Sequence, residues 1–201
     1  MGNSDSKNSL NNEKAFSNEK RQCLEKKDKS IKSSIDKPIL KLVNLINSSD
    51  DYYTTSSCSG RIVLLEKKSD KKQESKWLLI CHGKTDIDRL KKALSLSKHD
   101  VWFSFEPFIL HVCCRDIDSA RILLKSLNEL GLKRSGIMSL GNRILIEIIG
   151  DERLYTLVAK KGKVIAEESY LGILVDEANQ KAQRNDQKIR KLEKVIAKVL
   201  K

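Results

Sequence analysis

The chain contains 201 residues, of which 39% are hydrophobic and 33% are charged. This length and composition fit one compact domain with polar ends. No apolar run approaches the roughly 20 residues that cross a bilayer, and the polar N-terminus lacks the apolar stretch of a secretory signal. We therefore expect a cytoplasmic protein with no membrane partner. The formal net charge of +12 and the pI near 9.5 favour a polyanionic partner such as a nucleic acid.

The five cysteines do not form a recognisable framework. They stand at positions 23, 58, 81, 113 and 114. The odd number, the adjacent pair and the absence of a CxxC spacing argue against disulfides and against a zinc ribbon. We expect reduced thiols and no metal site, because no two of the cysteines and histidines have the short spacing of known zinc motifs.

The N-terminal half predicts a polar tail, one clear helix and three strands. Residues 1–14 carry too little apolar surface to offset the entropy of ordering, so we expect a disordered tail before the main domain at 15–201. A helix is expected to follow Asp36, which can act as its N-cap. The apolar stripe of this helix is Ile39, Leu42, Val43 and Ile46. Strands are expected at 52–57, 61–67 and 77–82, and the last two form a plausible hairpin.

The C-terminal half alternates helices and strands without a strict βα repeat. Helical patterns occupy 86–96 and 117–130, strand patterns occupy 101–105, 108–114, 133–139, 142–149, 154–159 and a short piece near Val164, and a long helix covers about 169–200. This order predicts an α+β fold with a mixed, largely antiparallel sheet flanked by helices and ending in the long helix. None of the glycines forms a GxG pair, so the glycine fingerprint of a Rossmann-type dinucleotide fold is absent.

The long C-terminal helix has an apolar seam at coiled-coil spacing. Its members are Leu171, Val175, Ala178, Ala182, Asn185, Ile189, Leu192, Ile196 and Val199. Only a few heptads are present, so we favour a helix packed across its own domain over an intermolecular coiled coil, and a monomer over an oligomer. The other faces are basic, which suits either a solvated surface or a rib that contacts phosphates.

Four short stretches carry chemistry. Residues 54–61 place hydroxyl groups, Cys58, a glycine and Arg61 between two strands, which can bind a carboxylate or a phosphate. Cys58 is alternatively a nucleophile if a base lies nearby. If the stretch 106–115 is a strand, His111 and Arg115 share one face, which suggests a site. The remaining two stretches are Cys81-His82-Gly83 and Lys133-Arg134-Ser135-Gly136.

These stretches resemble those of the tRNA wybutosine-synthesising methyltransferase family of archaea and eukaryotes. The matching strings are YYTTSSCSGRI, KWLLICHG, EPFILHVCCRD, LGLKRSGI and YLGILVDEANQKAQRN, in the family's order between Phe16 and Leu192. The resemblance implies transfer of a methyl group from S-adenosylmethionine to N4 of 7-(3-amino-3-carboxypropyl)-4-demethylwyosine. It also implies that this base stands at nucleotide 37, 3′ of the anticodon in the anticodon loop of tRNA-Phe, and that the fold is not the common methyltransferase fold.

The resemblance and the chemistry of methyl transfer together suggest roles for individual residues. The acceptor nitrogen must lose a proton, and the candidate bases are His82, His111 and Asp36. The candidates for binding the cofactor are Ser57, Cys58, Ser59, Gly60, Arg61, Arg115, Ser135 and Gly136. The candidates for contacting tRNA are Arg134, Lys188, Lys191 and Lys194. The residues leave open which stretch binds the methyl donor and which binds the modified base.

Two other classes of function are compatible with parts of the sequence. A non-catalytic basic RNA-binding module explains the net charge, but not histidine, cysteine and arginine gathered beside a serine-rich turn. An enzyme that depends on a thiol or a metal explains the cysteines, and it predicts stoichiometric zinc or iron in the purified protein.

Overall fold

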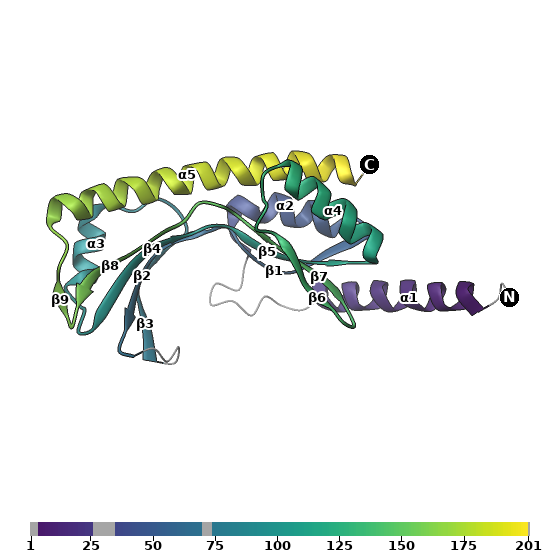
Figure 1. Ribbon diagram of the computed structural model, residues 1–201, viewed down its shortest axis with the longest axis horizontal. Helices are drawn as coiled ribbons and strands as arrows, with labels where there is room; N and C mark the ends of the chain where they lie inside the picture. Colours follow the sequence, from purple (N-terminus) through teal and green to yellow (C-terminus); the bar gives the residue numbers. More distant parts are fainter. Residues whose placement is uncertain (1–3, 26–34, 70–73, 201) are drawn as a thin grey trace. The chain divides into compact units, whose positions relative to one another are not determined.

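The computed structural model describes residues 4–25, 35–69 and 74–200 (Figure 1). The chain divides into two compact units. Unit 1 consists of Met1–Cys58, Ile109–Ile149 and Arg190–Lys201, and unit 2 consists of Ser59–Phe108 and Gly150–Ile189. Each unit contains one antiparallel sheet. None of the helices in the described ranges combines the length and the apolar character that a bilayer-spanning helix requires.

Unit 1 is built on a four-stranded sheet in the order β1-β5-β7-β6. The strands are β1 (Tyr52–Cys58), β5 (Ile109–Cys114), β6 (Gly136–Leu140) and β7 (Ile144–Ile149). Its helices are α1 (Ser4–Glu25), α2 (Lys37–Asn47), α4 (Ile117–Glu129) and the C-terminal end of α5 (Glu168–Val199). The stripe predicted for α2 is buried at all four positions, which confirms that the 3.6-residue period marks the face that packs.

The two faces of this sheet differ in character. Leu110 and Val112 of β5 and Ile146 of β7 are fully buried, and α2 and α4 pack against β1, β5 and β7. Because side chains alternate along a strand, His111 and Glu147 point to the opposite face, where both are partly exposed. The sheet therefore separates an apolar layer under helices from a face that carries polar groups.

Unit 2 is built on a five-stranded sheet in the order β3-β2-β4-β8-β9. The strands are β2 (Arg61–Lys67), β3 (Ser75–Cys81), β4 (Asp100–Glu106), β8 (Leu154–Lys160) and β9 (Lys163–Val164), and the helices are α3 (Ile87–Leu94) and most of α5. The predicted hairpin is confirmed, since β2 pairs antiparallel with β3. Side chains of α3 and α5 share one core with Ile62, Leu64 and Phe103 of the sheet.

The predicted α+β class and the long C-terminal helix are confirmed, and every strand pair among the described residues is antiparallel. The strands form two sheets rather than one. Before Ser59-Gly60, β1 pairs with β5, and after this turn β2 pairs with β4. At the N-terminus, α1 extends to Ser4, whereas the sequence predicts disorder through residue 14. Phe16 of α1 contacts the rest of unit 1, since its ring lies 5.3 Å from that of Tyr53. Residues 1–3 lie outside the described ranges.

The seam of α5 packs within the protein, as predicted. In unit 2, Leu171, Val175 and Ala178 belong to the core. The one polar member, Asn185, is 2% exposed and bridges two turns. Its Oδ1 accepts the N–H of Phe108 at 2.8 Å, and its Nδ2 donates to the carbonyl of Ser59 at 2.7 Å. A buried amide thus satisfies two backbone groups that have left their strands.

Asn185→Ala should lower stability without changing the fold, because it leaves a buried N–H and a buried carbonyl without partners. Each unsatisfied group costs about 1–3 kcal/mol, and each kcal/mol lowers Tm by about 2–4 °C in a chain of this size. Gln187→Ala, an exposed position two residues away on α5, is the matched control. Equal melting temperatures for the two variants in calorimetry would show that the bridge is not needed.

Candidate active site

The turn between β1 and β2 has a backbone that only glycine adopts readily. Gly60 has φ +97°, in the left-handed region. A Cβ on this residue would lie 3.0 Å from the Glu106 carbonyl oxygen and 3.2 Å from the Phe108 nitrogen. Ser59, which precedes it, is buried and held by Asn185. The serine-rich stretch therefore ends in a turn that is packed closely against the β4–β5 connection.

A small pocket in unit 2 brings two of the predicted stretches together. It has a volume of about 20 Å³. Its lining is Ser59, Gly60, Arg61, Cys81, His82, Gly83, Phe105, Ala182, Asn185 and Asp186. The first six are the end of the serine-rich stretch and the whole of Cys81-His82-Gly83, which are about 20 residues apart in the chain. Sequence reasoning missed the contribution of α5, although a polar residue in an apolar seam was a signal for Asn185.

Arg61 is already engaged by neighbouring side chains. Its Nε lies 2.7 Å from Oε2 of Glu106, and its guanidinium carbon lies 4.8 Å from the centroid of the Trp77 ring. Its side chain remains about one-third exposed. An arginine held in this way has a defined orientation at the pocket, with donors left for a ligand, since the guanidinium offers five N–H groups.

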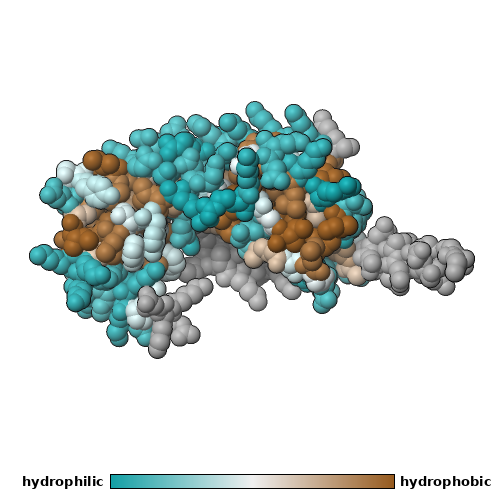
Figure 2. All heavy atoms as spheres, viewed as in Figure 1, coloured by the Kyte–Doolittle hydropathy of each residue, from teal (hydrophilic) through white to brown (hydrophobic). Residues whose placement is uncertain are grey.

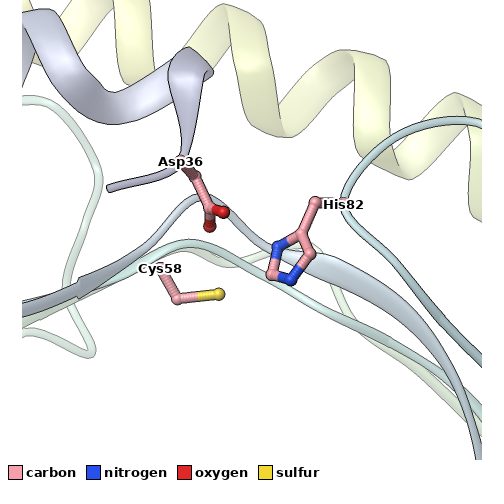
Figure 3. A group of neighbouring side chains, drawn as sticks. All are labelled: Asp36, Cys58 and His82. Carbon is pink, nitrogen blue, oxygen red and sulfur yellow. The ribbon is translucent and has the colours of Figure 1, made fainter. Parts of the chain in front are cut away.

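In unit 1, Asp36 and Cys58 are neighbours. Asp36 precedes α2 at the N-cap position, but its side chain makes no capping hydrogen bond. A carboxylate oxygen of Asp36 and the Sγ atom of Cys58 lie within 4.8 Å of each other. Figure 3 shows the Asp36 side chain directed toward Cys58 at the end of β1, and it also draws His82, which belongs to unit 2. The Asp36 carboxylate is therefore directed at the end of β1 rather than at the start of α2.

His111 is the centre of a hydrogen-bonded group on the polar face of the unit 1 sheet. Its Nδ1 lies 2.7 Å from Oγ of Ser56, and its Nε2 lies 3.4 Å from Oε2 of Glu147. The strand register places these residues side by side, with His111 opposite Ser56 on β1 and opposite Glu147 on β7. A carboxylate beside an imidazole orients the ring. Sequence reasoning missed Ser56 and Glu147 because strand pairing is not visible in one sequence.

The cysteines of β5 are buried beside aromatic side chains. Cys113 and Cys114 are 1% and 3% exposed. Burial raises the pKa of the Cys113 thiol above its usual value and raises the pKa of Cys114 to about 12. A thiol with a raised pKa is protonated near neutral pH and is a poor nucleophile. These two residues therefore contribute to packing rather than to chemistry.

Several other predicted site residues have structural partners. Arg115 lies just beyond the end of β5 and pairs with Asp51 at 2.8 Å and Asp116 at 3.3 Å. Ser135 accepts the N–H of Ile149 through its Oγ at 3.2 Å. Gly136 begins β6 and is paired with Glu147, and Ser57 is paired with Leu110 on β5. Arg134 is exposed in the turn before β6.

The basic residues of α5 fall into two groups. Lys181 and Arg184 pair with Glu152 at 3.3 Å and 2.8 Å, and Lys188 pairs with Asp151 at 3.4 Å. Arg190, Lys191, Lys194 and Lys198 are exposed, and none of them has a carboxylate within ion-pairing distance among the residues that the structure describes. Figure 2 shows that most of the surface along α5 is hydrophilic. Lys191 and Lys194 therefore belong to the part of the helix whose charge is available to a polyanion.

Comparisons with known proteins agree with this description. Residues 18–198 match the model of the family described as Methyltransferase TYW3. A tRNA wybutosine-synthesizing protein 3 homolog from Danio rerio is 35% identical over 92% of this chain and 76% of its own length. A protein of Archaeoglobus fulgidus is 36% identical over 81% of this chain and 83% of its own length, and it is named tRNA(Phe) 7-((3-amino-3-carboxypropyl)-4-demethylwyosine(37)-N(4))-methyltransferase. The solved structure of the PH1069 protein from Pyrococcus horikoshii superposes with a TM-score of 0.84 at 31% identity, covering 92% of this chain and 97% of the other.

The fold and the family match define a methyltransferase that lacks the Rossmann-type fold. Because the family model covers nearly the whole chain, the protein belongs to the TYW3 methyltransferase family. The family that the sequence motifs resemble is therefore confirmed.

Burial and raised pKa values predict that Cys113 and Cys114 resist alkylation. Under native conditions near neutral pH, iodoacetamide should modify the partly exposed Cys23, Cys58 and Cys81 first, and Cys113 and Cys114 only after unfolding. Peptide mass spectrometry of native and urea-treated samples measures the rate of alkylation at each cysteine in the folded and in the unfolded protein. Rapid native labelling of Cys113 or Cys114 would contradict the packing described for β5.

Proposed function

We propose that the protein methylates N4 of 7-(3-amino-3-carboxypropyl)-4-demethylwyosine at position 37 of tRNA(Phe), with S-adenosylmethionine as the methyl donor. The observation that carries the proposal is the match to the Archaeoglobus fulgidus protein of that name over most of both chains. A second relative of the same name, from Methanocaldococcus jannaschii, is 34% identical over 75% of this chain. A tRNA substrate is also the reason to expect the protein in the cytoplasm.

The pocket in unit 2 supports recognition of an α-amino-acid group. Arg61 and Asp186 supply opposite charges at its lining, and the turn at Ser59-Gly60 contributes to the same lining. A volume of about 20 Å³ is too small for a whole cofactor and suits only a small polar end. Both proposed reactants carry such an end, since S-adenosylmethionine contains methionine and the base contains an aminocarboxypropyl chain. An ammonium group would pair with Asp186, and a carboxylate would pair with Arg61.

His111 is the residue best arranged to remove the proton from the acceptor nitrogen. Methyl transfer from a sulfonium needs positioned reactants and a base, and it needs no covalent intermediate on the enzyme. Nε2–H donates to Glu147, which orients the ring, and this leaves Nδ1 as the nitrogen that takes up the proton. Ser56 Oγ donates to Nδ1, so it would pass its own proton to the ring as it receives the proton of the acceptor nitrogen. Asp36 and His82 remain candidates for the same role.

The central test is methyl transfer by the full chain to tRNA(Phe) that lacks only this methyl group, followed by mass spectrometry of the nucleosides. His111→Ala should slow transfer by about 10²- to 10⁴-fold, the usual contribution of a general base. The loss should shrink as the pH rises, because hydroxide increasingly replaces the missing base.

Glu147→Gln separates a positioning role from a structural one. If Glu147 acts through His111, this single variant should lower the rate and shift the pH profile, while adding it to His111→Ala should cause little further loss. Tm is the control for folding. Wild-type rates in His111→Ala would remove His111 from the mechanism, and a wild-type protein that transfers no methyl to this tRNA would refute the proposed function.

Lys191 and Lys194 are proposed to contact phosphates of the tRNA, while Lys188 serves mainly in its pair with Asp151. Changing Lys191 and Lys194 together to Gln should make the slope of log affinity against log salt shallower by about 0.7–0.9 for each phosphate that is no longer neutralised. Binding of S-adenosylmethionine should be unaltered. Lys188→Gln is the matched control and should change the slope less. The same slope in the double variant and the wild type would show that this part of α5 is only solvated.

A further inference from the structure

One face of the unit 2 sheet carries stacked aromatic rings beside a cation. The rings of Trp102 and Tyr155 lie 4.6 Å apart at an interplanar angle of 7°. Nζ of Lys67 lies 5.8 Å from the centroid of Trp102 and 3.3 Å from the hydroxyl oxygen of Tyr155. Tyr155 is 58% exposed. We call Lys67, Trp102 and Tyr155 the aromatic platform.

The strand register explains why the platform faces away from the core. Phe103 of β4 is fully buried, so its neighbours in the strand, Trp102 and Ser104, point to the other face. Ser104 is paired with Tyr155, which places that ring on the same face as Trp102. The core formed with α3 and α5 lies on the Phe103 side of the sheet. The rings are therefore presented on a surface that the helices of this unit do not cover (Figure 1).

A basic pocket of about 500 Å³ adjoins the platform. It is lined by Lys67, Lys68, Ser69, Lys98, His99, Asp100, Trp102 and Lys161. The four lysines have no carboxylate within ion-pairing distance in the described part of the chain. The single acid of the pocket, Asp100, is occupied: it accepts the backbone N–H of Lys161 at 2.8 Å, which holds its pKa below the usual value, and it lies 3.6 Å from Nζ of Lys160. The pocket thus presents uncompensated positive charge beside an aromatic surface.

The backbone around this pocket is held in a defined shape. Lys161 adopts φ +49° in the two-residue turn between β8 and β9, a conformation uncommon for a residue other than glycine. The next residue, Gly162, donates its N–H to the carbonyl of His99, and a Cβ there would lie 3.0 Å from the Lys98 carbonyl oxygen. On the other side, Glu66 accepts the N–H groups of Lys98 and His99. The backbone that carries Lys98 and Lys161 is therefore held in place by hydrogen bonds.

We propose that the aromatic platform and the basic pocket form a second RNA subsite. An unpaired base stacks on the exposed ring of Tyr155, and the phosphates that flank it enter the pocket lined by Lys67, Lys68, Lys98 and Lys161. Aromatic rings next to cations are the means by which proteins hold single-stranded RNA, since every base offers a face for stacking. This inference rests on the proposed function, because that function makes tRNA the RNA that the subsite would bind.

The subsite lies at the opposite end of β2 from the pocket at Gly60. Arg61 begins this strand and Lys67 ends it, and six residues of a strand span about 20 Å. An RNA strand that reaches both ends would be several nucleotides long. The subsite would therefore read an unpaired stretch at a distance from the reacting base and would contribute to the choice of RNA rather than to chemistry.

The test uses the full chain with two probes, an unstructured oligoadenylate and a strand of the same length that lacks bases. Fluorescence anisotropy gives the affinities. Tyr155→Ala should weaken oligoadenylate binding about 5- to 150-fold, the effect of losing one stacked base. Tyr155→Phe keeps the ring and should bind nearly as the wild type does. Tyr170→Ala, at an exposed tyrosine on α5 of the same unit, is the matched control and should cause no change.

The binding of phosphates has a separate readout. Changing Lys98 and Lys161 together to Gln should make the salt slope shallower by about 0.7 for each phosphate that is no longer neutralised, with either probe. The strand without bases should bind more weakly than oligoadenylate and should not respond to Tyr155→Ala. Wild-type affinity of Tyr155→Ala for oligoadenylate would overturn the proposal. So would an equal loss for both probes, because that would indicate an electrostatic change without stacking.

Methyl transfer measured on the same preparations separates the two proposals. If the wild-type chain transfers no methyl to the tRNA but its oligoadenylate binding depends on Tyr155, the proposed function fails and the subsite stands. If methyl transfer occurs and oligoadenylate binding ignores Tyr155, the subsite fails and the proposed function stands. Melting temperatures of the exposed Tyr155 variants should equal that of the wild type.

Discussion

A single buried amide holds the backbone on which the unit 2 pocket depends. Asn185 accepts from Phe108 and donates to Ser59, so one side chain satisfies both the turn that follows β1 and the turn that follows β4. The alternative, a leucine at this seam position, would bury two unpaired backbone groups, whose cost exceeds the gain from one apolar side chain. The polar residue is therefore required by the backbone, and the tight turn at Gly60, whose missing Cβ makes room for the amide, completes the arrangement.

The charged side chains also divide into those that have local ion-pair partners and those that remain available to a ligand. The net charge of +12 is spread over many side chains, but several of them are consumed locally. Arg115 is paired with two aspartates, and Lys181 and Arg184 share Glu152 and Glu177. Such exposed pairs contribute little to stability, yet they lower the charge that a nucleic acid would encounter. The positive surface left for RNA is consequently smaller than the sequence suggests, and it includes Lys191 and Lys194 and the basic pocket.

Most of the elements could be predicted because their signals are local. The apolar stripe of α2, the hairpin of β2 and β3 and the extent of α5 all follow from hydrophobic periodicity, and the structure confirms them. The division into two sheets could not be predicted in this way, because it depends on which strands pair. Pairing is a non-local choice decided by packing, and a list of strands leaves it open.

The site shows the same limit at the level of single side chains. Sequence motifs named His111 as a candidate, but a base becomes credible only through Ser56 and Glu147, and those neighbours come from strands β1 and β7. Arg115 had equal standing in the sequence, and only its ion pairs reveal that it lies past the end of the strand among aspartates. A residue type thus shows which chemistry is possible, whereas the cross-strand register decides whether a side chain has an orienting partner or a competing one. In this chain the alternation of β5 decides between the two environments, since one step along the strand separates the partly exposed imidazole of His111 from the fully buried Val112.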